Sequence, residues 1–160
     1  MTEELNIRPA VASDSETLSD LAYRSKAYWG YATDFMEACR EELSVSVTDI
    51  ANPERSYFVA ELRDVVVGFY ALERLSASES ELEAMFVAPQ HIGQGIGRRL
   101  IEHAKIHARQ NGAASLLIQG DPNAMSFYRA AGGILVGERE SDSIQGRYLP
   151  EFRIDVSSSG

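Results

Sequence analysis

The stretch that decides the fold runs from residue 82 to residue 100 and reads LEAMFVAPQHIGQGIGRRL. Apolar and other side chains alternate over residues 82–87, which predicts a strand. Gly93, Gly95 and Gly97 then follow at alternate positions where a helix begins. A helix start exposes unpaired backbone N–H groups and the positive end of the helix dipole, and glycines leave that backbone open to a ligand. The stretch therefore predicts a strand, an anion-binding loop and a helix in succession.

The charges in the first turn of this helix support the same interpretation. Helices ordinarily place Asp or Glu there, but this one places Arg98 and Arg99. Each such cation costs about 0.3–1 kcal/mol at a helix start unless an anion offsets it, and a bound pyrophosphate would be such an anion. The alternative is that the glycines only form a tight turn and that the arginines only increase solubility.

The rest of the chain predicts one mixed α+β domain over residues 1–156, with a disordered tail at residues 157–160. Apolar residues recur every four positions from Ile96 to Ala108, and Asn111-Gly112 ends this helix. Two β-rich runs flank Arg63-Asp64, which predicts an antiparallel hairpin. The expected strands cover residues 5–8, 56–62, 65–75, 82–86, 115–118, 134–136 and 148–156, and the other helices start near residue 13 or 14 and cover residues 34–43 and 121–131.

Charge and composition limit the possible partners. The net charge is −9, and residues 1–89 carry 7 Lys and Arg against 17 Asp and Glu, whereas residues 90–110 carry 4 against 1. An acidic chain with one small basic island offers no broad positive face to nucleic acid, but the island suits a small anion. No apolar run reaches the about 20 residues of a membrane span, and Cys39 is the only cysteine, so we expect a soluble cytoplasmic protein without disulfides.

Two common glycine-loop motifs do not fit residues 92–98. A dinucleotide-binding loop requires G-x-G-x-x-G, but with Gly93 as the first position the sixth is Arg98, and the loop follows an antiparallel meander. A Walker loop requires Gly-Lys-Ser/Thr, which is absent here.

Residues 82–100 do resemble motif A of the GNAT superfamily of N-acetyltransferases, in which a fourth strand, a pyrophosphate loop and a third helix follow in this order. One position departs from the family pattern Q/R-x-x-G-x-G/A, because its first residue falls on Ile92. Main-chain amides bind most of the pyrophosphate in this family, so we expect that departure to weaken affinity at most. The resemblance implies a central, mostly antiparallel twisted sheet of about seven strands flanked by about four helices.

A second resemblance lies about 30 residues further on, where residues 121–132 read DPNAMSFYRAAG. They are similar to the family segment N-A-x-x-F-Y-x-x-x-G, in which the asparagine contacts the pantetheine arm and the tyrosine faces the thioester sulfur. That places these roles on Asn123 and Tyr128. The same residues also have structural explanations, since Asp121 can cap a helix, Pro122 suits its first position, and Phe127 can pack in the core.

The resemblance implies an enzyme that moves an acetyl group from acetyl-CoA to an amine by direct attack on the thioester. Tyr128 would assist the leaving thiolate, and a backbone N–H near Phe86 or Val87 would stabilise the oxyanion. Glu83 is the expected base, with Glu81 on the same face as the alternative. The expected cofactor-binding residues are Met85, Phe86, Val87, Gly93, Gln94, Gly95, Ile96, Gly97, Arg98, Asn123 and Tyr128.

The acceptor side is less specific in the sequence. Aromatic residues gather at the junction of the first two expected helices, a region that borders the acceptor pocket in this family, although aromatics there are commonly core. The acidic background favours a cationic amine, either a small molecule or a peptide, and exposed sheet edges allow a homodimer. The candidate acceptor residues are Tyr28, Trp29, Tyr31 and Phe35.

Several alternatives stay open. The chain could be a non-catalytic acyl-CoA-binding regulatory module of the same fold, or a transferase that uses a longer acyl chain or an O-linked acceptor. His103 and His107 have the i, i+4 spacing of a metal pair, but they share a polar helix face and have no evident third ligand. We therefore expect no metal.

Overall fold

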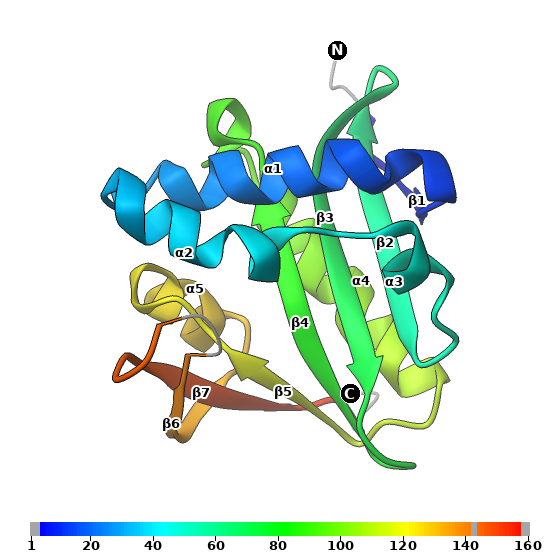
Figure 1. Cartoon of the computed structure of the whole chain (residues 1–160). Helices are drawn as coiled ribbons and strands as arrows, with labels where there is room; N and C mark the ends of the chain where they lie inside the picture. The colour runs from blue at the N-terminus through cyan, green and yellow to red at the C-terminus, as the bar shows by residue number, and fades with distance from the viewer. Residues whose placement is uncertain (1–3, 142–143, 158–160) are drawn as a thin grey trace.

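The structure is a computed structural model that describes residues 4–141 and 144–157. Within these residues a seven-stranded sheet runs through the molecule in the order β1-β2-β3-β4-β5-β7-β6 (Figure 1). β4 and β5 are parallel, and the other neighbours are antiparallel. The strands are β1 (Asn6–Pro9), β2 (Arg55–Leu62), β3 (Val65–Arg74), β4 (Glu79–Val87), β5 (Ser115–Gln119), β6 (Ile134–Glu140) and β7 (Tyr148–Asp155).

Helices cover both faces of the sheet, with α1 and α2 crossing one face and α4 lying on the other (Figure 1). The mixed α+β fold with a mostly antiparallel sheet is confirmed. Three 3₁₀ turns accompany the helices, at Ala12–Asp14, Pro89–His91 and Pro122–Ala124. The helices are α1 (Ser15–Ala27), α2 (Thr33–Leu43), α3 (Val47–Ala51), α4 (Ile96–Gln110) and α5 (Met125–Ala130). None of the helices in the described ranges has an apolar stretch of the length needed to span a membrane.

The hairpin between β2 and β3 turns at Arg63 and Asp64, as predicted. Both residues have positive φ, 51° and 63°, which is the backbone of a type I′ turn. That turn matches the right-handed twist of the two strands and fixes their register.

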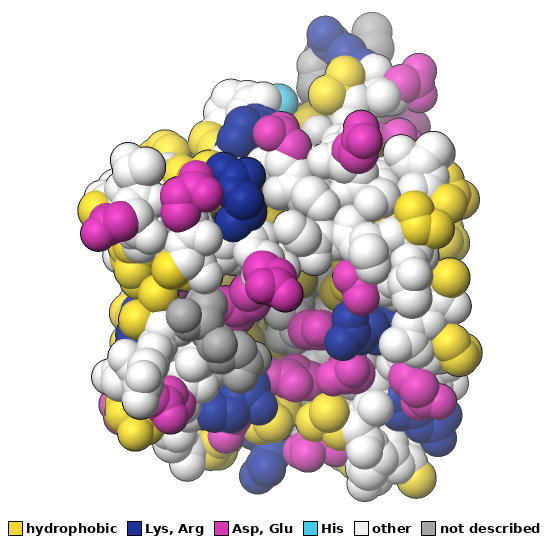
Figure 2. Space-filling model, viewed as in Figure 1, with side chains coloured by type: hydrophobic (Ala, Val, Ile, Leu, Met, Phe, Trp, Pro, Cys, Tyr) yellow, Lys and Arg dark blue, Asp and Glu magenta, His cyan; other side chains and the backbone are white. Residues whose placement is uncertain are grey.

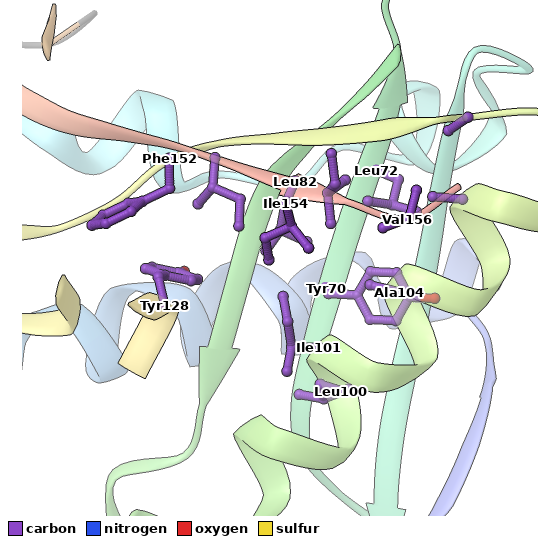
Figure 3. Close-up of a cluster of buried hydrophobic side chains, with 14 of the residues drawn as sticks. Tyr70, Leu72, Leu82, Leu100, Ile101, Ala104, Tyr128, Phe152, Ile154 and Val156 are labelled. Atoms are coloured by element: carbon purple, nitrogen blue, oxygen red, sulfur yellow. The ribbon is translucent and has the colours of Figure 1, made fainter. Parts of the chain in front are cut away.

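Two apolar layers hold the helices to the sheet. On the α4 face, Leu100 and Ile101 pack with Tyr70 and Leu82, and Phe152 extends this layer to Tyr128 (Figure 3). On the α1 and α2 face, buried side chains from both helices, Leu18 and Leu21 among them, pack against Phe69 and neighbouring residues of β2 and β3. Each layer buries one face of the sheet, so the strands are held rigidly from both sides.

β4 and β5 pair over only four positions, from Glu79↔Ser115 to Leu82↔Ile118. β4 continues to Val87, but β5 ends at Gln119, and the two strands diverge beyond their paired segment (Figure 1). The second half of β4 therefore has β3 on one side and a gap in the sheet on the other. Most of the cofactor-binding residues predicted from the sequence line a cavity at this gap.

Candidate active site

The gap between β4 and β5 belongs to a cavity of about 1070 Å³ with two arms. The first, which we call the cofactor arm, contains the glycine loop, the second half of β4 and the start of α5. All of the predicted cofactor residues except Gln94 line the cavity. The second, which we call the acidic arm, is lined by Glu41, Glu42, Asp49, Glu73, Glu81 and Glu83.

The glycine loop has a backbone that suits glycine at two positions. Gly93 and Gly95 have φ of +89° and +83°, and a Cβ at either position would meet no atom within 4 Å. Side chains are therefore excluded there by backbone conformation, while the space beside the loop stays open. Gly95 is the residue from which α4 starts, so the loop leads directly into the positive end of that helix.

Backbone N–H groups at this helix start are available to a ligand. Among the described residues, no N–H of residues 93–98 donates to a protein acceptor, and the first turn-closing bond is from Arg99 to the carbonyl of Gly95 at 3.2 Å. Arg98 and Arg99 are exposed and form no ion pair within the described ranges, and the first turn holds no acidic residue. Unpaired N–H groups, the helix dipole and two cations together suit the binding of an anion.

Gly97 is required for close packing rather than for its backbone conformation. A Cβ at this position would lie 3.3 Å from the Phe127 ring and 3.8 Å from Val87. The missing side chain thus lets the start of α4 pack closely against Phe127 of α5.

The unpaired edge of β4 supplies further N–H groups. The N–H of Ala88 donates to the carbonyl of Val67 at 2.8 Å. In an antiparallel pair hydrogen-bonded positions alternate, so Phe86 also pairs with β3, and the N–H groups of Met85 and Val87 point to the gap. Of the two positions predicted for the oxyanion donor, Val87 has its N–H on the open side.

Tyr128 lies where the two arms meet. Its side chain is buried, packed between Phe127 and Phe152 at ring-centroid distances of 5.3 and 5.9 Å (Figure 3). Its hydroxyl group makes no hydrogen bond to the described residues, yet it is not sealed from solvent, and Tyr128 lines the cavity. Burial, with a further contribution from Asp121, raises the pKa of Tyr128 above its ordinary value. The phenol is thus held protonated, with its O–H free for a ligand.

Glu83 occupies a β-bulge. Leu72 pairs with Leu82 and Ala71 pairs with Ala84, so Glu83 is the extra residue of β4. Glu83 lies two residues after Glu81, both side chains line the cavity, and the Glu83 carboxylate lies 3.3 Å from Arg55. Burial raises the pKa of Glu83 although Arg55 opposes this, and the nearby carboxylates Glu73, Glu81 and Asp49 add to the increase.

The acidic arm forms a recess with strong negative charge. Figure 2 shows acidic side chains around the hollow beneath α2, with basic side chains among them. Arg55 bonds to Asp49 at 3.1 Å and to Glu73 at 3.2 Å, and Arg139 forms an ion pair with Glu81. Arg55 and Arg139 were not predicted from the sequence, because neither lies near a recognisable motif and only strand pairing brings them to the site.

Comparisons with known proteins identify the family. A family model described as an acetyltransferase (GNAT) domain matches residues 53–132. The peptidyl-lysine N-acetyltransferase YjaB of Salmonella typhimurium is 32% identical over 142 residues, which cover 88% of this chain and 90% of that protein. The chain belongs to the GNAT acetyltransferase family. The predicted resemblance and the enzyme class are thereby confirmed.

Other relatives of this GNAT chain span similar lengths. The N-acetyltransferase YhfO of Bacillus subtilis, described as uncharacterized, is 30% identical over 136 residues, covering 80% of this chain and 89% of that protein. The crystal structure of the PaiA N-acetyltransferase from Thermoplasma acidophilum, in complex with coenzyme A, has a TM-score of 0.80 at 19% identity, covering 95% of this chain and 99% of that one. The shared architecture extends over nearly the whole domain.

Within this GNAT chain, the loop position that departs from the family pattern is occupied by the exposed Ile92. The loop is braced instead by a hydrogen bond of 2.9 Å between Nδ1 of His91 and Oε1 of Gln94. His91 lines the cavity, whereas Gln94 does not.

The four aromatic residues predicted at the acceptor side of this GNAT chain separate into two groups. Trp29 lines the cavity, and Tyr28 is exposed and makes an edge contact with Trp29 at 5.5 Å. Tyr31 and Phe35 stack on each other at 4.4 Å beside Asn123. Tyr31 and Phe35 thus belong to a cluster beside Asn123, while Trp29 is part of the cavity wall.

His103 and His107 contact the sheet in this GNAT chain. Nδ1 of His103 lies 2.7 Å from the hydroxyl of Tyr70, and Nε2 of His107 lies 3.2 Å from that of Ser56. Burial lowers the pKa of both histidines. In the described ranges no group of three or more potential metal ligands comes together.

Proposed function

We propose that the protein transfers an acetyl group from acetyl-CoA to an amine by direct attack on the thioester. The observation that carries this proposal is the row of unpaired N–H groups at residues 93–98, which opens onto the same cavity as the hydroxyl of Tyr128. A diphosphate fits the loop, and a thioester placed beside β4 would lie close to Tyr128. The coenzyme A complex of the PaiA enzyme, which shares the fold, supports this cofactor class.

The cofactor arm offers each part of coenzyme A a matching group. The N–H groups of the glycine loop and the charge of Arg98 suit the diphosphate. Asn123 suits the amide groups of the pantetheine arm. The outward N–H of Val87 suits the thioester carbonyl, whose oxygen becomes negative during the attack.

In the proposed reaction the amine nitrogen bonds to the acetyl carbonyl carbon, and the carbon–sulfur bond breaks with its electron pair on sulfur. Tyr128 donates a hydrogen bond to that sulfur, because a phenol with a raised pKa keeps its proton beside a thiolate of pKa about 8.5. The thiolate then takes up a proton, and coenzyme A leaves.

Glu83 accepts the proton that the amine loses, directly or through water. The pKa of Glu83 is raised and so lies closer to neutral pH than that of an ordinary glutamate. A general base is more effective when its pKa is near the working pH. Glu81 is less suited to this role, because its side chain is only 13% exposed, against 33% for that of Glu83.

The acidic arm favours a cationic acceptor. Six carboxylates face it, against the two guanidinium groups of Arg55 and Arg139, so an amine in its ammonium form is attracted into the recess. A lysine side chain has this chemistry, and the relative YjaB is named as a peptidyl-lysine N-acetyltransferase, which supports the assignment.

The test is to incubate the protein with acetyl-CoA and a panel of amines and to measure free thiol. We expect amine-dependent thiol release and a product heavier by one acetyl group, with cationic amines the best acceptors. Tight binding of acetyl-CoA without thiol release would contradict catalysis and indicate a binding module. Mass spectrometry of the products would reveal a longer acyl chain or an O-linked acceptor.

A further inference from the structure

The hydroxyl of Tyr31 is the centre of a polar cluster that joins three distant segments. It lies 2.8 Å and 3.0 Å from the two carboxylate oxygens of Asp121, 3.1 Å from Nδ2 of Asn123 and 3.0 Å from a guanidinium nitrogen of Arg147. Tyr31 lies in the α1–α2 junction, and Asp121 and Asn123 lie between β5 and α5. Arg147 is the residue immediately before β7.

The protonation of this cluster is defined by its surroundings. Burial acts to raise the pKa of Asp121, but hydrogen bonds from the Asn123 backbone and from Tyr31, together with Lys26 at 3.3 Å, outweigh it and lower that pKa. Burial and the neighbouring Asp121 raise the pKa of Tyr31. The hydroxyl therefore donates to the carboxylate and accepts from Asn123 and Arg147, which uses its one donor and both acceptor sites.

This arrangement fixes the side-chain amide of Asn123. One amide hydrogen goes to Asp121 at 2.9 Å and the other to Tyr31. Asp121 is an ionised carboxylate and can only accept, so the amide nitrogen must face this cluster. The carbonyl oxygen of Asn123 is then the atom left for a ligand, and Asn123 lines the cofactor arm.

The ring of Tyr31 is held in place separately from its hydroxyl. Phe35 stacks on it at 4.4 Å, and the cations of Lys26 and Arg147 lie 5.2 Å and 5.3 Å from its centroid. These contacts do not involve the hydroxyl oxygen. A phenylalanine at this position would keep the stack and lose only the hydrogen bonds.

We propose that Tyr31 is a positioning residue for the cofactor: together with Asp121, it holds Asn123 so that the Asn123 carbonyl oxygen accepts an N–H group of the pantetheine arm. This inference rests on the proposed function. It also means that the hydroxyl of Tyr31 connects the α1–α2 junction to the cofactor arm. Trp29, in the same junction, lines the cavity.

The test is a double-mutant cycle on acetyl-CoA binding, measured by calorimetry with Tyr31→Phe, Asn123→Ala and the double variant. We expect Tyr31→Phe to raise the Kd about 5- to 10-fold, the effect of one lost hydrogen bond, with kcat at saturating acetyl-CoA changed less than about twofold. In the Asn123→Ala background the same change should have no further effect, because the orienting bond has nothing left to orient.

The matched control is Tyr23→Phe, which removes a hydroxyl that bonds Glu37 at 3.3 Å on the outer surface of α1 and should leave the Kd unchanged. An unchanged Kd in Tyr31→Phe, or losses that add in the double variant, would overturn the positioning role alone. Failure of the unmodified protein to bind acetyl-CoA would overturn the proposed function as well. If Tyr31→Phe folds poorly, Asp121→Asn provides the second cycle, with the same non-additivity expected against Asn123→Ala.

Discussion

Gly120 and Tyr128 are in such close contact that a Cβ on Gly120 would lie 3.0 Å from two carbon atoms of the Tyr128 ring. Gly120 follows β5 directly, so the end of that strand defines where the phenol lies. We predict that Gly120→Ala displaces the ring and lowers kcat about 10-fold or more, because small misplacements of a reacting group are costly. Steady-state kinetics would measure this. Gly137→Ala is the control, since a Cβ there meets no atom within 4 Å. Equal losses of kcat in both variants would show that the contact between Gly120 and Tyr128 is not what matters.

Removing the Tyr128 hydroxyl tests the chemistry itself. Tyr128→Phe keeps the buried ring and should lower kcat by about 10²-fold, with little change in the KM for acetyl-CoA, because the bond to the leaving sulfur matters most in the transition state. Tyr148→Phe, at an exposed position in β7, is the matched control. An undiminished kcat would remove Tyr128 from the mechanism.

The role of Glu83 predicts a pH dependence. Only the ionised carboxylate is a base, and the pKa of Glu83 is raised, so kcat should increase with pH through a value above that of an ordinary glutamate. Glu83→Gln should lower kcat about 10- to 100-fold and abolish that limb of the profile, measured from about pH 4 to about pH 9.

Two further variants make the assignment of the base specific. Glu138→Gln, on the exposed strand β6, should leave the pH profile as it is. If Glu81→Gln rather than Glu83→Gln removes the acidic limb, Glu81 is the base.

The glycine loop predicts a binding defect without a large effect on the chemical step. Gly95→Ala forces a side chain into a backbone with φ of +83° at the start of α4, which shifts the N–H groups of the loop. We expect the Kd for acetyl-CoA to rise about 10-fold. Gly112→Ala imposes similar strain, with φ of +95°, at the opposite end of α4, so binding should be retained there. Comparable weakening in both variants would point to a general effect on the helix.

The half-buried His103 predicts that the free energy of unfolding depends on pH. Its pKa is lowered in the folded protein, so the unfolded chain binds the proton more readily, and the free energy of unfolding should fall as pH decreases below about 6.5. Denaturant titrations at about pH 7.5 and about pH 5.5 would measure the decrease. His103→Gln should make the decrease smaller, and an unaltered slope would show that other groups account for it.

The sequence predicted the elements whose information is local. The four-residue spacing from Ile96 to Ala108 predicted α4, and the glycines predicted the loop before it. Both features depend on residues that are close in the sequence, within one or two helical turns. The predicted helix at residues 121–131 is a 3₁₀ turn followed by the shorter α5. Helix α3 was missed, although the capping box of Ser46 and Asp49 is a local sign of it. Most of the predicted disordered tail lies outside the described residues.

The remaining features of the site depend on contacts between distant residues. The bulge at Glu83 arises from the register of β4 on β3, and no spacing in β4 alone indicates it. The bond between Tyr31 and Asn123 joins positions 92 residues apart. The direction of the Val87 N–H depends on which strand pairs lie opposite each other, so the sequence left Phe86 and Val87 equivalent.

The divergence of β4 and β5 also affects how durable the folded protein is. The N–H groups of Met85 and Val87 face the gap and are partly withdrawn from water, and those of residues 93–98 find no acceptor in the part of the chain that the structure describes. A donor left in that state reduces stability by about 1–3 kcal/mol when fully desolvated. A ligand that supplies acceptors should raise the free energy of unfolding by about 2.7 kcal/mol at a hundredfold excess over its Kd. The protein should then resist heat and proteases better as the concentration of acetyl-CoA increases.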